Sequence, residues 1–146
     1  MNVSFYPIDR DRDAHGMFKH LPYILEAQAK GIIAVDNDTG KPIAFAIFDR
    51  WTASSATGHW WIGDPLVLRH GFFEECADYL FNTCKLKQLM GYIAENNTES
   101  FKLAKSIGMT ELFRIKDGFD EDVDMIVLSL HVDDAGRWLT NQKEAA

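Results

Sequence analysis

A predicted strand, a polar cap and a short helix follow one another between residues 89 and 109, and this order constrains the fold most. Residues 89–94 form an apolar run that is typical of a buried strand. Asn97 then suits a helix cap, because its side-chain oxygen can accept a hydrogen bond from the free N–H groups of the first turn. Apolar and small residues recur at helical spacing up to Gly108, which suits the left-handed residue that ends many helices. The pattern alone predicts a strand, a capped helix and a glycine stop.

Further predicted elements cover most of the chain. Strands are predicted at residues 2–8, 32–35, 43–48, 59–63, 89–94, 111–115 and 123–130, with helices up to about residue 29, over 71–84 and between 97 and 108. Residues 116–122 are a predicted loop. This order predicts an α+β fold with one mixed, mostly antiparallel sheet of about six to seven strands and helices on both faces. We expect a single domain over residues 1–146, with a core from about 2 to 130 and a polar, frayed tail from 131 to 146.

Composition and charge exclude several classes of function. The net charge of −7 and the lack of a dense basic run predict no nucleic-acid binding, because the surface repels phosphate. No apolar run approaches the ~20 residues of a membrane helix, and the first residues lack the regions of a signal peptide. We therefore expect a cytoplasmic protein that does not bind membranes. Cys76 and Cys84 stand eight positions apart in one predicted helix, which is too far for a disulfide. The sequence has no Cys-x-x-Cys pair, so we expect no metal site.

Residues 95–109 resemble a segment of the GNAT superfamily of N-acetyltransferases, Asn-x-x-Ser/Ala-x-x-Leu-x-x-x-x-Gly-Phe. Asn97, Ser100, Leu103 and Gly108 stand at its fixed positions. The predicted order of elements is similar to that fold over residues 2–130, and residues 113–130 resemble the group acting on protein N-termini and small amines. The resemblance implies splayed central strands with acetyl-CoA between them. It also implies transfer of the acetyl group to a primary amine, on a small molecule or a protein, by direct attack in a ternary complex. An acidic surface suits such a cationic acceptor.

The resemblance also implies a place for the coenzyme. The family's phosphate-binding segment, Arg/Gln-x-x-Gly-x-Gly/Ala, corresponds to the residues just before the second predicted helix. Leu68, Arg69, His70 and Gly71 would then meet the diphosphate, with Asn97 further along the coenzyme. The alternative for Asn97 is a helix cap alone.

This segment departs from the family pattern. Phe72, Phe73 and Glu74 stand where the family has small residues, and Glu74 adds a negative charge. Two interpretations follow. Backbone amides do most of the contact in such sites, so a rebuilt loop could still bind phosphate with help from Arg69 and His70. Alternatively, the fold has lost coenzyme binding.

Candidate catalytic groups lie near the ends of the predicted central strands. Acetyl transfer to an amine needs a base for the ammonium proton, and an acid helps the thiolate to leave. Many relatives carry a tyrosine acid on the helix that follows Asn97, but Ala104 stands at that position. Ser100 could serve instead, or could be a small packing residue. His59, Asp64 and Glu95 are candidate bases; a surface histidine and a turn residue are the alternatives for His59 and Asp64.

Two further expectations concern the aromatic residues and the partners. Trp60 and Trp61 are neighbours on a predicted strand and must face opposite sides, so only one could line an acceptor site. A second copy could pair with an exposed final strand to form a homodimer. The rival hypothesis is a non-catalytic interaction protein with this fold, similar to small GNAT-like proteins of bacteriophages, that has lost its cofactor.

Overall fold

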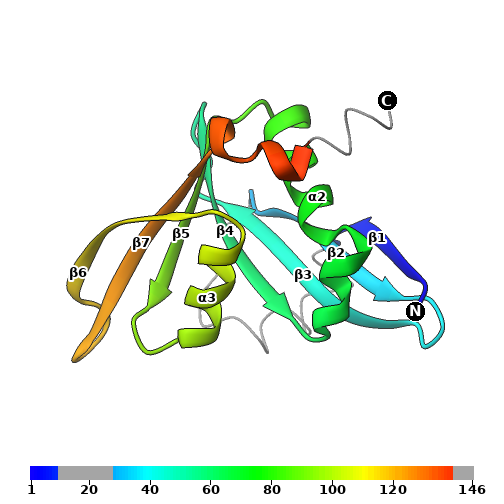
Figure 1. The fold of residues 1–146 in the computed structure, drawn as a ribbon, viewed down its shortest axis with the longest axis horizontal. Coiled ribbons are helices and arrows are strands. Elements are labelled where there is room, and N and C mark those ends of the chain that lie inside the picture. The colour runs from blue at the N-terminus through cyan, green and yellow to red at the C-terminus, as the bar shows by residue number, and fades with distance from the viewer. Residues whose placement is uncertain (10–27, 140–146) are drawn as a thin grey trace.

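One mixed sheet of seven strands organises the chain in the computed structural model, which describes residues 1–9 and 28–139. The strands are β1 (Val3–Pro7), β2 (Lys30–Asp36), β3 (Lys41–Asp49), β4 (Ser55–Ile62), β5 (Gln88–Ala94), β6 (Thr110–Asp120) and β7 (Val123–His131). They lie in the order β1-β2-β3-β4-β5-β7-β6 (Figure 1). Neighbouring strands are antiparallel except β4 and β5. The predicted mixed, mostly antiparallel sheet is confirmed.

Two helices of the described chain correspond to predicted ones. Helix α2 (Phe72–Ala77) continues into a π-helical segment, η2 (Asp78–Thr83), and together they match the helix predicted at 71–84. Helix α3 (Thr98–Ser106) is capped by Asn97, whose side-chain oxygen accepts a hydrogen bond of 3.2 Å from the backbone N–H of Ser100. Gly108 follows it with φ of 102°, so the predicted cap and glycine stop are confirmed. Nearly all of the helix predicted to end near residue 29 lies outside the described residues.

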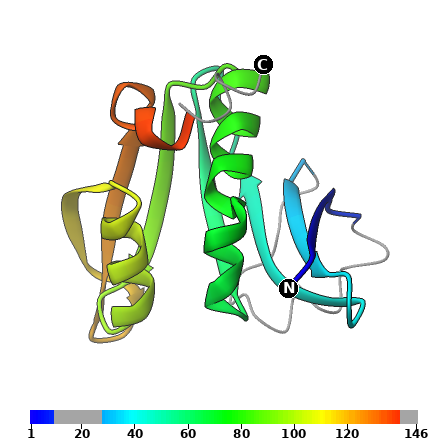
Figure 2. The ribbon, with the colours of Figure 1, turned by 45° about the vertical axis from the view of Figure 1, so that its right-hand side comes forward.

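Both described helices pack on the same face of the sheet. Figures 1 and 2 show α2 beside the half that carries β1 to β4, and α3 beside the half that carries β5 to β7. The larger buried cluster joins them to the sheet, whereas a smaller cluster of Ile33, Phe45 and Ile47 lies on the other face. Trp60 packs against the first cluster and Trp61 against the second. The expectation that the two tryptophans face opposite sides is therefore confirmed.

Several predicted boundaries are wrong. Strand β4 begins at Ser55, so His59 lies within it and not at its start. Strand β6 continues to Asp120 through most of the predicted loop, with irregular register after Glu111 and after Ile115. Its polar composition is tolerated because β6 is an edge strand with largely exposed side chains. The final strand, β7, lies between β5 and β6 and is not an exposed edge.

Buried residues also extend beyond the expected core boundary at residue 130. A short 3₁₀ helix, η3 (Val132–Asp134), follows β7, and Ala135 and Leu139 are buried. The indole N–H of Trp138 donates a hydrogen bond of 2.8 Å to the carbonyl of Ile107. The expected polar, frayed tail is therefore wrong for residues 132–139, while 140–146 lie outside the described residues.

Candidate active site

Strands β4 and β5 pair at one end and then separate. Residues 55–57 pair with residues 88–90, and this ladder stops although both strands continue. Figures 1 and 2 show the two strands diverging beyond that point. The next residues in this register are Gly58 and Gly91, and the side chains of Trp60 and Met109 pack over their backbone. The splayed central strands implied by the family resemblance are therefore present, and glycines stand where the splay begins.

A cavity of about 150 Å³ lies between the diverging strands. Gly58, His59 and Trp60 line it from β4, together with residues of β5 and α3. Since neighbouring residues of a strand point to opposite faces, a cavity that touches all three passes from one face of the sheet toward the other. Its volume is well below the ~300 Å³ of the smaller ligand sites. It can therefore hold a thin chain or a small acyl group.

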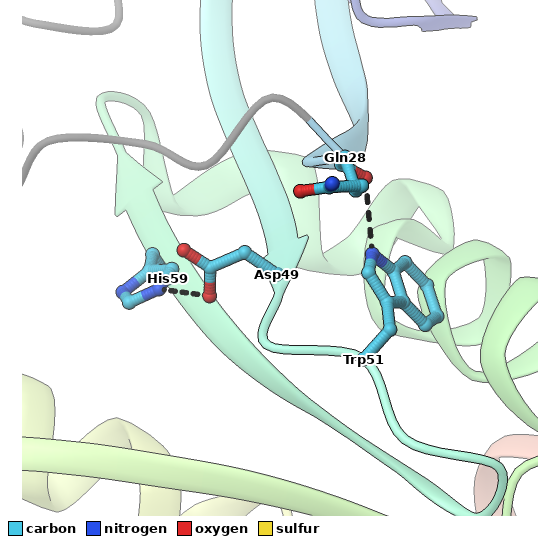
Figure 3. A network of polar contacts seen from close by, with 4 residues as sticks. All are labelled: Gln28, Asp49, Trp51 and His59. Carbon is cyan, nitrogen blue, oxygen red and sulfur yellow. Dashed lines mark hydrogen bonds and ion pairs between the residues drawn. The ribbon is translucent and has the colours of Figure 1, made fainter.

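A buried acid–histidine pair lies beside this cavity, and His59 is its member in the lining. His59 Nε2 and Asp49 Oδ1 are 2.8 Å apart, and the two side chains are only 10% and 5% exposed. The β3–β4 register sets Ile47 opposite His59, so Asp49 lies diagonally across from it on the face away from α2 (Figure 3). A carboxylate only accepts hydrogen bonds, so Nε2 carries the proton of a neutral His59. Nδ1 is then the ring nitrogen that can take up a proton.

Asp49 is a site residue that the sequence analysis did not identify. It ends an apolar strand and precedes Arg50, so in the sequence it resembles the first residue of a turn. The available signal was the antiparallel pairing of β3 with β4, which brings residues ten positions apart together. The turn that follows is held by Trp51, whose indole N–H donates a hydrogen bond of 3.1 Å to the carbonyl of Gln28 (Figure 3). The guanidinium of Arg50 lies 5.8 Å from the ring centre of Tyr92 on β5.

Two predicted residues, the N-cap of α3 and one in its first turn, reach the cavity. Asn97 and Ser100 both line it, and Ser100 is half-buried. Asn97 therefore caps the helix and also borders the cleft, while its contact with the coenzyme stays a prediction. Ala104 lines the same cavity. It stands where many relatives have a tyrosine, so this chain presents only a methyl group to the cleft there.

The other two candidate bases lie outside the cavity lining. The carboxylate of Asp64 accepts a hydrogen bond of 3.0 Å from the backbone N–H of Leu66 and caps η1 (Pro65–His70). Glu95 is exposed, and its carboxylate accepts a hydrogen bond of 3.2 Å from the backbone N–H of Asp124. Of the three candidates, His59 is the one that the fold brings to the cleft.

The residues expected to meet the diphosphate lie just before α2. Leu68 packs partly against the core, and Arg69 and His70 are exposed at the end of η1. Gly71 has a left-handed backbone with φ of 86° and forms the N-cap of α2. None of these four residues lines the cavity between β4 and β5.

The three residues after Gly71 that depart from the family pattern have two different environments. The side chains of Phe72 and Phe73 are buried in the core, 0% and 6% exposed, so their rings do not cover the backbone at Gly71. The carboxylate of Glu74 lies where it would oppose an anion bound at Gly71. Its Oε2 is buried without a hydrogen-bond partner among the described residues, 3.9 Å from where a Cβ on Gly71 would lie.

The remaining titratable groups of α2 and η2 do not border the cavity. Burial raises the pKa of the Cys76 thiol, which keeps it protonated and unreactive. Burial, and then the charge of Asp78, raises the pKa of Glu75. Burial and the neighbouring Cys84 raise the pKa of Tyr79 to about 12. Within residues 1–9 and 28–139 no cluster of three histidine, cysteine or acidic residues could hold a metal, and no helix is long and apolar enough to cross a membrane.

Comparison with known proteins gives a match at the level of structure. No protein-family model and no curated protein matches the sequence. The spermidine/spermine N-acetyltransferase SpeG from Vibrio cholerae, in complex with manganese ions, superposes with a TM-score of 0.73 at 12% identity, over 95% of this chain and 96% of that one. SpeG with CoA and spermine gives a TM-score of 0.73 at 13% identity over 91% and 97%, and its dodecameric form gives 0.73 at 13% over 95% and 97%. The chain therefore has the fold of the GNAT N-acetyltransferases.

Proposed function

We propose that this protein is an N-acetyltransferase that moves an acetyl group from acetyl-CoA to a primary amine. The observation that carries this proposal is the buried Asp49–His59 pair, whose histidine lines the cleft between the splayed strands. The fold supports it, since the similar structures are of acetyltransferases named for spermidine and spermine, one of them in complex with CoA. A general base beside a narrow cleft is what acetyl transfer to an ammonium group requires.

The cleft fits the pantetheine arm of acetyl-CoA better than its diphosphate. Beyond residues 57 and 90, the facing edges of β4 and β5 form no ladder with each other, so their N–H and C=O groups can bind the amides of a pantetheine arm. The side chains of Trp60 and Met109 lie over Gly58 and Gly91 and border the space for that arm. The diphosphate would meet Arg69, His70 and the Gly71 backbone, with Glu74 opposing it. When bound, acetyl-CoA supplies an activated acetyl thioester.

The protein side chains then divide the proton transfers. His59 takes a proton from the acceptor ammonium through Nδ1, directly or through a water, while Asp49 orients the ring and stabilises the imidazolium that forms. The neutral amine attacks the acetyl carbonyl, which N–H groups on the unpaired edge of β4 can polarise. The hydroxyl of Ser100 is the candidate donor to the departing sulfur, because Ala104 offers none.

The proposed acceptor is a cation, either a small amine or a basic protein segment. The chain carries a net charge of −7, which attracts cations to its surface. Phe119 of β6 lines the cavity, and carboxylates at positions 117, 120, 121, 122 and 124 surround the nearby β6–β7 turn. Spermidine is the first acceptor to test, and a lysine-containing peptide is the second.

Calorimetry and product analysis test the proposal. We expect CoA and acetyl-CoA to release or absorb heat on binding the folded protein, and spermidine or the peptide to gain one acetyl group by mass spectrometry. His59→Gln is the control, since it should bind the coenzyme and form little product. A folded sample that gives no heat at millimolar coenzyme would refute the proposal.

A non-catalytic interaction protein is the second candidate, and Glu74 favours it. An unpaired carboxylate beside Gly71 repels a diphosphate at the place where the fold would bind one. The two candidates differ in the behaviour of Glu74→Gln. If wild-type protein binds no CoA and this variant does, the charge of Glu74 prevents coenzyme binding. That result would support the non-catalytic interaction protein. If wild-type protein binds CoA, the enzyme role is retained.

A further inference from the structure

The ring of Trp60 lies between the cleft and a second, smaller cavity. The cleft cavity of about 150 Å³ and a cavity of about 20 Å³ share three lining residues, Trp60, Phe73 and Ile107, which together form a partition. The rest of the smaller cavity is lined by apolar and aromatic side chains and by Cys76, from α2, η2, β5, β7 and the residues after η3. An apolar space therefore lies on the far side of the partition from the cleft.

Gly58 allows the Trp60 ring to take this position. A Cβ on Gly58 would lie 2.2 and 2.3 Å from Cζ3 and Cη2 of the ring, so the ring folds back over the backbone two residues before its own. Gly58 is also the first residue of β4 after its ladder with β5 ends, so the ring covers the closed end of the splay. Phe48 meets the ring edge-on at a centroid distance of 5.7 Å, and Phe73 lies at 6.4 Å. These contacts hold the ring between the two cavities.

The proposed function brings the acyl group of the donor to this ring. His59 lines the cleft, so the thioester carbonyl must lie near it for the acceptor amine to attack. The proposed diphosphate site at Gly71 follows the other end of β4, and the donor therefore points its acyl end toward the closed end of the splay. Trp60 and His59 are neighbours on one strand and face opposite sides of the sheet. The acyl chain then lies against the apolar partition, and the amine arrives from the side of His59.

We propose that Trp60 sets the length of the acyl group that this protein transfers, by closing the smaller cavity to chains longer than acetyl. The inference rests on the proposed function. For every acyl group the carbon–sulfur bond of the thioester breaks and a carbon–nitrogen bond forms, while the nitrogen loses two protons, one through His59 to water and one to the departing thiolate. Only the fit of the acyl chain differs. A cavity of about 150 Å³ that also holds the end of the pantetheine arm has little space for further methylenes.

The first experiment compares acyl donors on the full chain. Rates with acetyl-CoA, propionyl-CoA and butyryl-CoA, with spermidine as the acceptor, give kcat/KM for each donor. We expect wild-type protein to prefer acetyl-CoA to butyryl-CoA at least about tenfold, because each methylene that does not fit an apolar pocket has an effect of this size. Trp60→Leu joins the two cavities and should reduce that preference about tenfold or more. Trp61→Leu is the matched control: its ring packs on the opposite face, 5.5 Å from Phe45, so the wild-type preference should remain.

A milder variant and a binding measurement accompany this comparison. Trp60 packs against the core, so Trp60→Leu also lowers stability. Ile107→Val removes one methylene from the same partition and should shift the preference in the same direction by a smaller factor. Calorimetry measures the selectivity without turnover. Trp60→Leu should raise the affinity for butyryl-CoA relative to both acetyl-CoA and CoA, which has no acyl group.

Two results would overturn this role of Trp60 and leave the proposed function intact. One is wild-type protein that transfers acetyl and butyryl groups equally well. The other is the same shift in Trp61→Leu as in Trp60→Leu. A folded wild-type protein that binds no acyl-CoA by calorimetry refutes the proposed function, and the role of Trp60 with it.

Discussion

Replacing Asp49 by asparagine tests the proposed acid–histidine pair most directly. The variant keeps an oxygen within reach of His59 Nε2 and nearly the same volume, so packing at this buried position changes little. It removes the negative charge that would stabilise a protonated His59. We therefore expect a large effect on acetyl transfer and a small one on the fold. Denaturant unfolding should show a loss of about 1.5 to 3 kcal/mol, the range for a hydrogen bond to a charged group.

The geometry sets the size of the expected rate effect. The two groups are 2.8 Å apart and nearly excluded from water, so a charge-assisted hydrogen bond between them has a net value of about 1.5–3 kcal/mol. That free energy corresponds to a roughly 10- to 150-fold loss in kcat/KM when it is lost from the transition state. His59→Gln removes the base itself and should cost about 10²–10⁴-fold.

The assay is the initial rate of CoA release from acetyl-CoA and spermidine, at substrate concentrations below KM. The double variant decides the mechanism: if Asp49 acts through His59, adding Asp49→Asn to His59→Gln should cause little further loss. Additive losses would refute the pairing, because they would show that Asp49 acts independently of His59.

Three further predictions concern the cleft and the stability of the fold. Gly58→Ala should raise KM for acetyl-CoA, because the new Cβ would lie 2.2 Å from the ring of Trp60; Gly136→Ala, with nothing within 4 Å of its new methyl, is the control in the same kinetic assay. Ser100→Ala should lower kcat about tenfold or more with little change in coenzyme binding by calorimetry, if its hydroxyl protonates the thiolate; an unchanged kcat would assign Ser100 to packing. Glu75→Gln should stabilise the protein increasingly as pH rises past 4.5, the ordinary pKa of a glutamate. Burial raises the pKa of Glu75, so the wild-type fold loses stability as this carboxyl ionises. Urea midpoints of both proteins at acidic and neutral pH measure the difference.

The sequence predicts the elements of the fold well where local chemistry decides them. The cap at Asn97 and the stop at Gly108 depend on residues within one turn, and both are as predicted. Boundaries are wrong where tertiary position decides. The predicted loop after residue 115 is strand because β6 is an edge, where polar side chains face water at no cost. Residues 132–139 contribute to the core because Leu139 is buried in it and Trp138 packs against it and hydrogen-bonds to Ile107, contacts that the sequence cannot show.

The candidate site is only partly predictable for the same reason. The sequence indicates His59 by its residue type and its closeness to the splay. It does not indicate Asp49, since the role of Asp49 depends on the β3–β4 register and on burial at 3% exposure. Asp64 and Glu95 also lie at strand ends, but their carboxylates accept backbone hydrogen bonds at other places. Strand ends predict where polar groups gather, and the pairing of strands determines which of them face one another.

The burial of Asp49 bears on the choice between an enzyme and a binding protein. Among the described residues, Asp49 and Thr57 are the polar or charged residues that are buried, and they stand opposite each other in the β3–β4 ladder. Burying a carboxylate costs several kcal/mol unless its partners compensate, and an apolar pair of similar volume often packs there with equal or better stability. A protein that only presents its outer surface to a partner gains nothing from an acid beneath an internal cleft. A base that must hold a positive charge during each turnover does gain from it, so the position of Asp49 favours the enzyme.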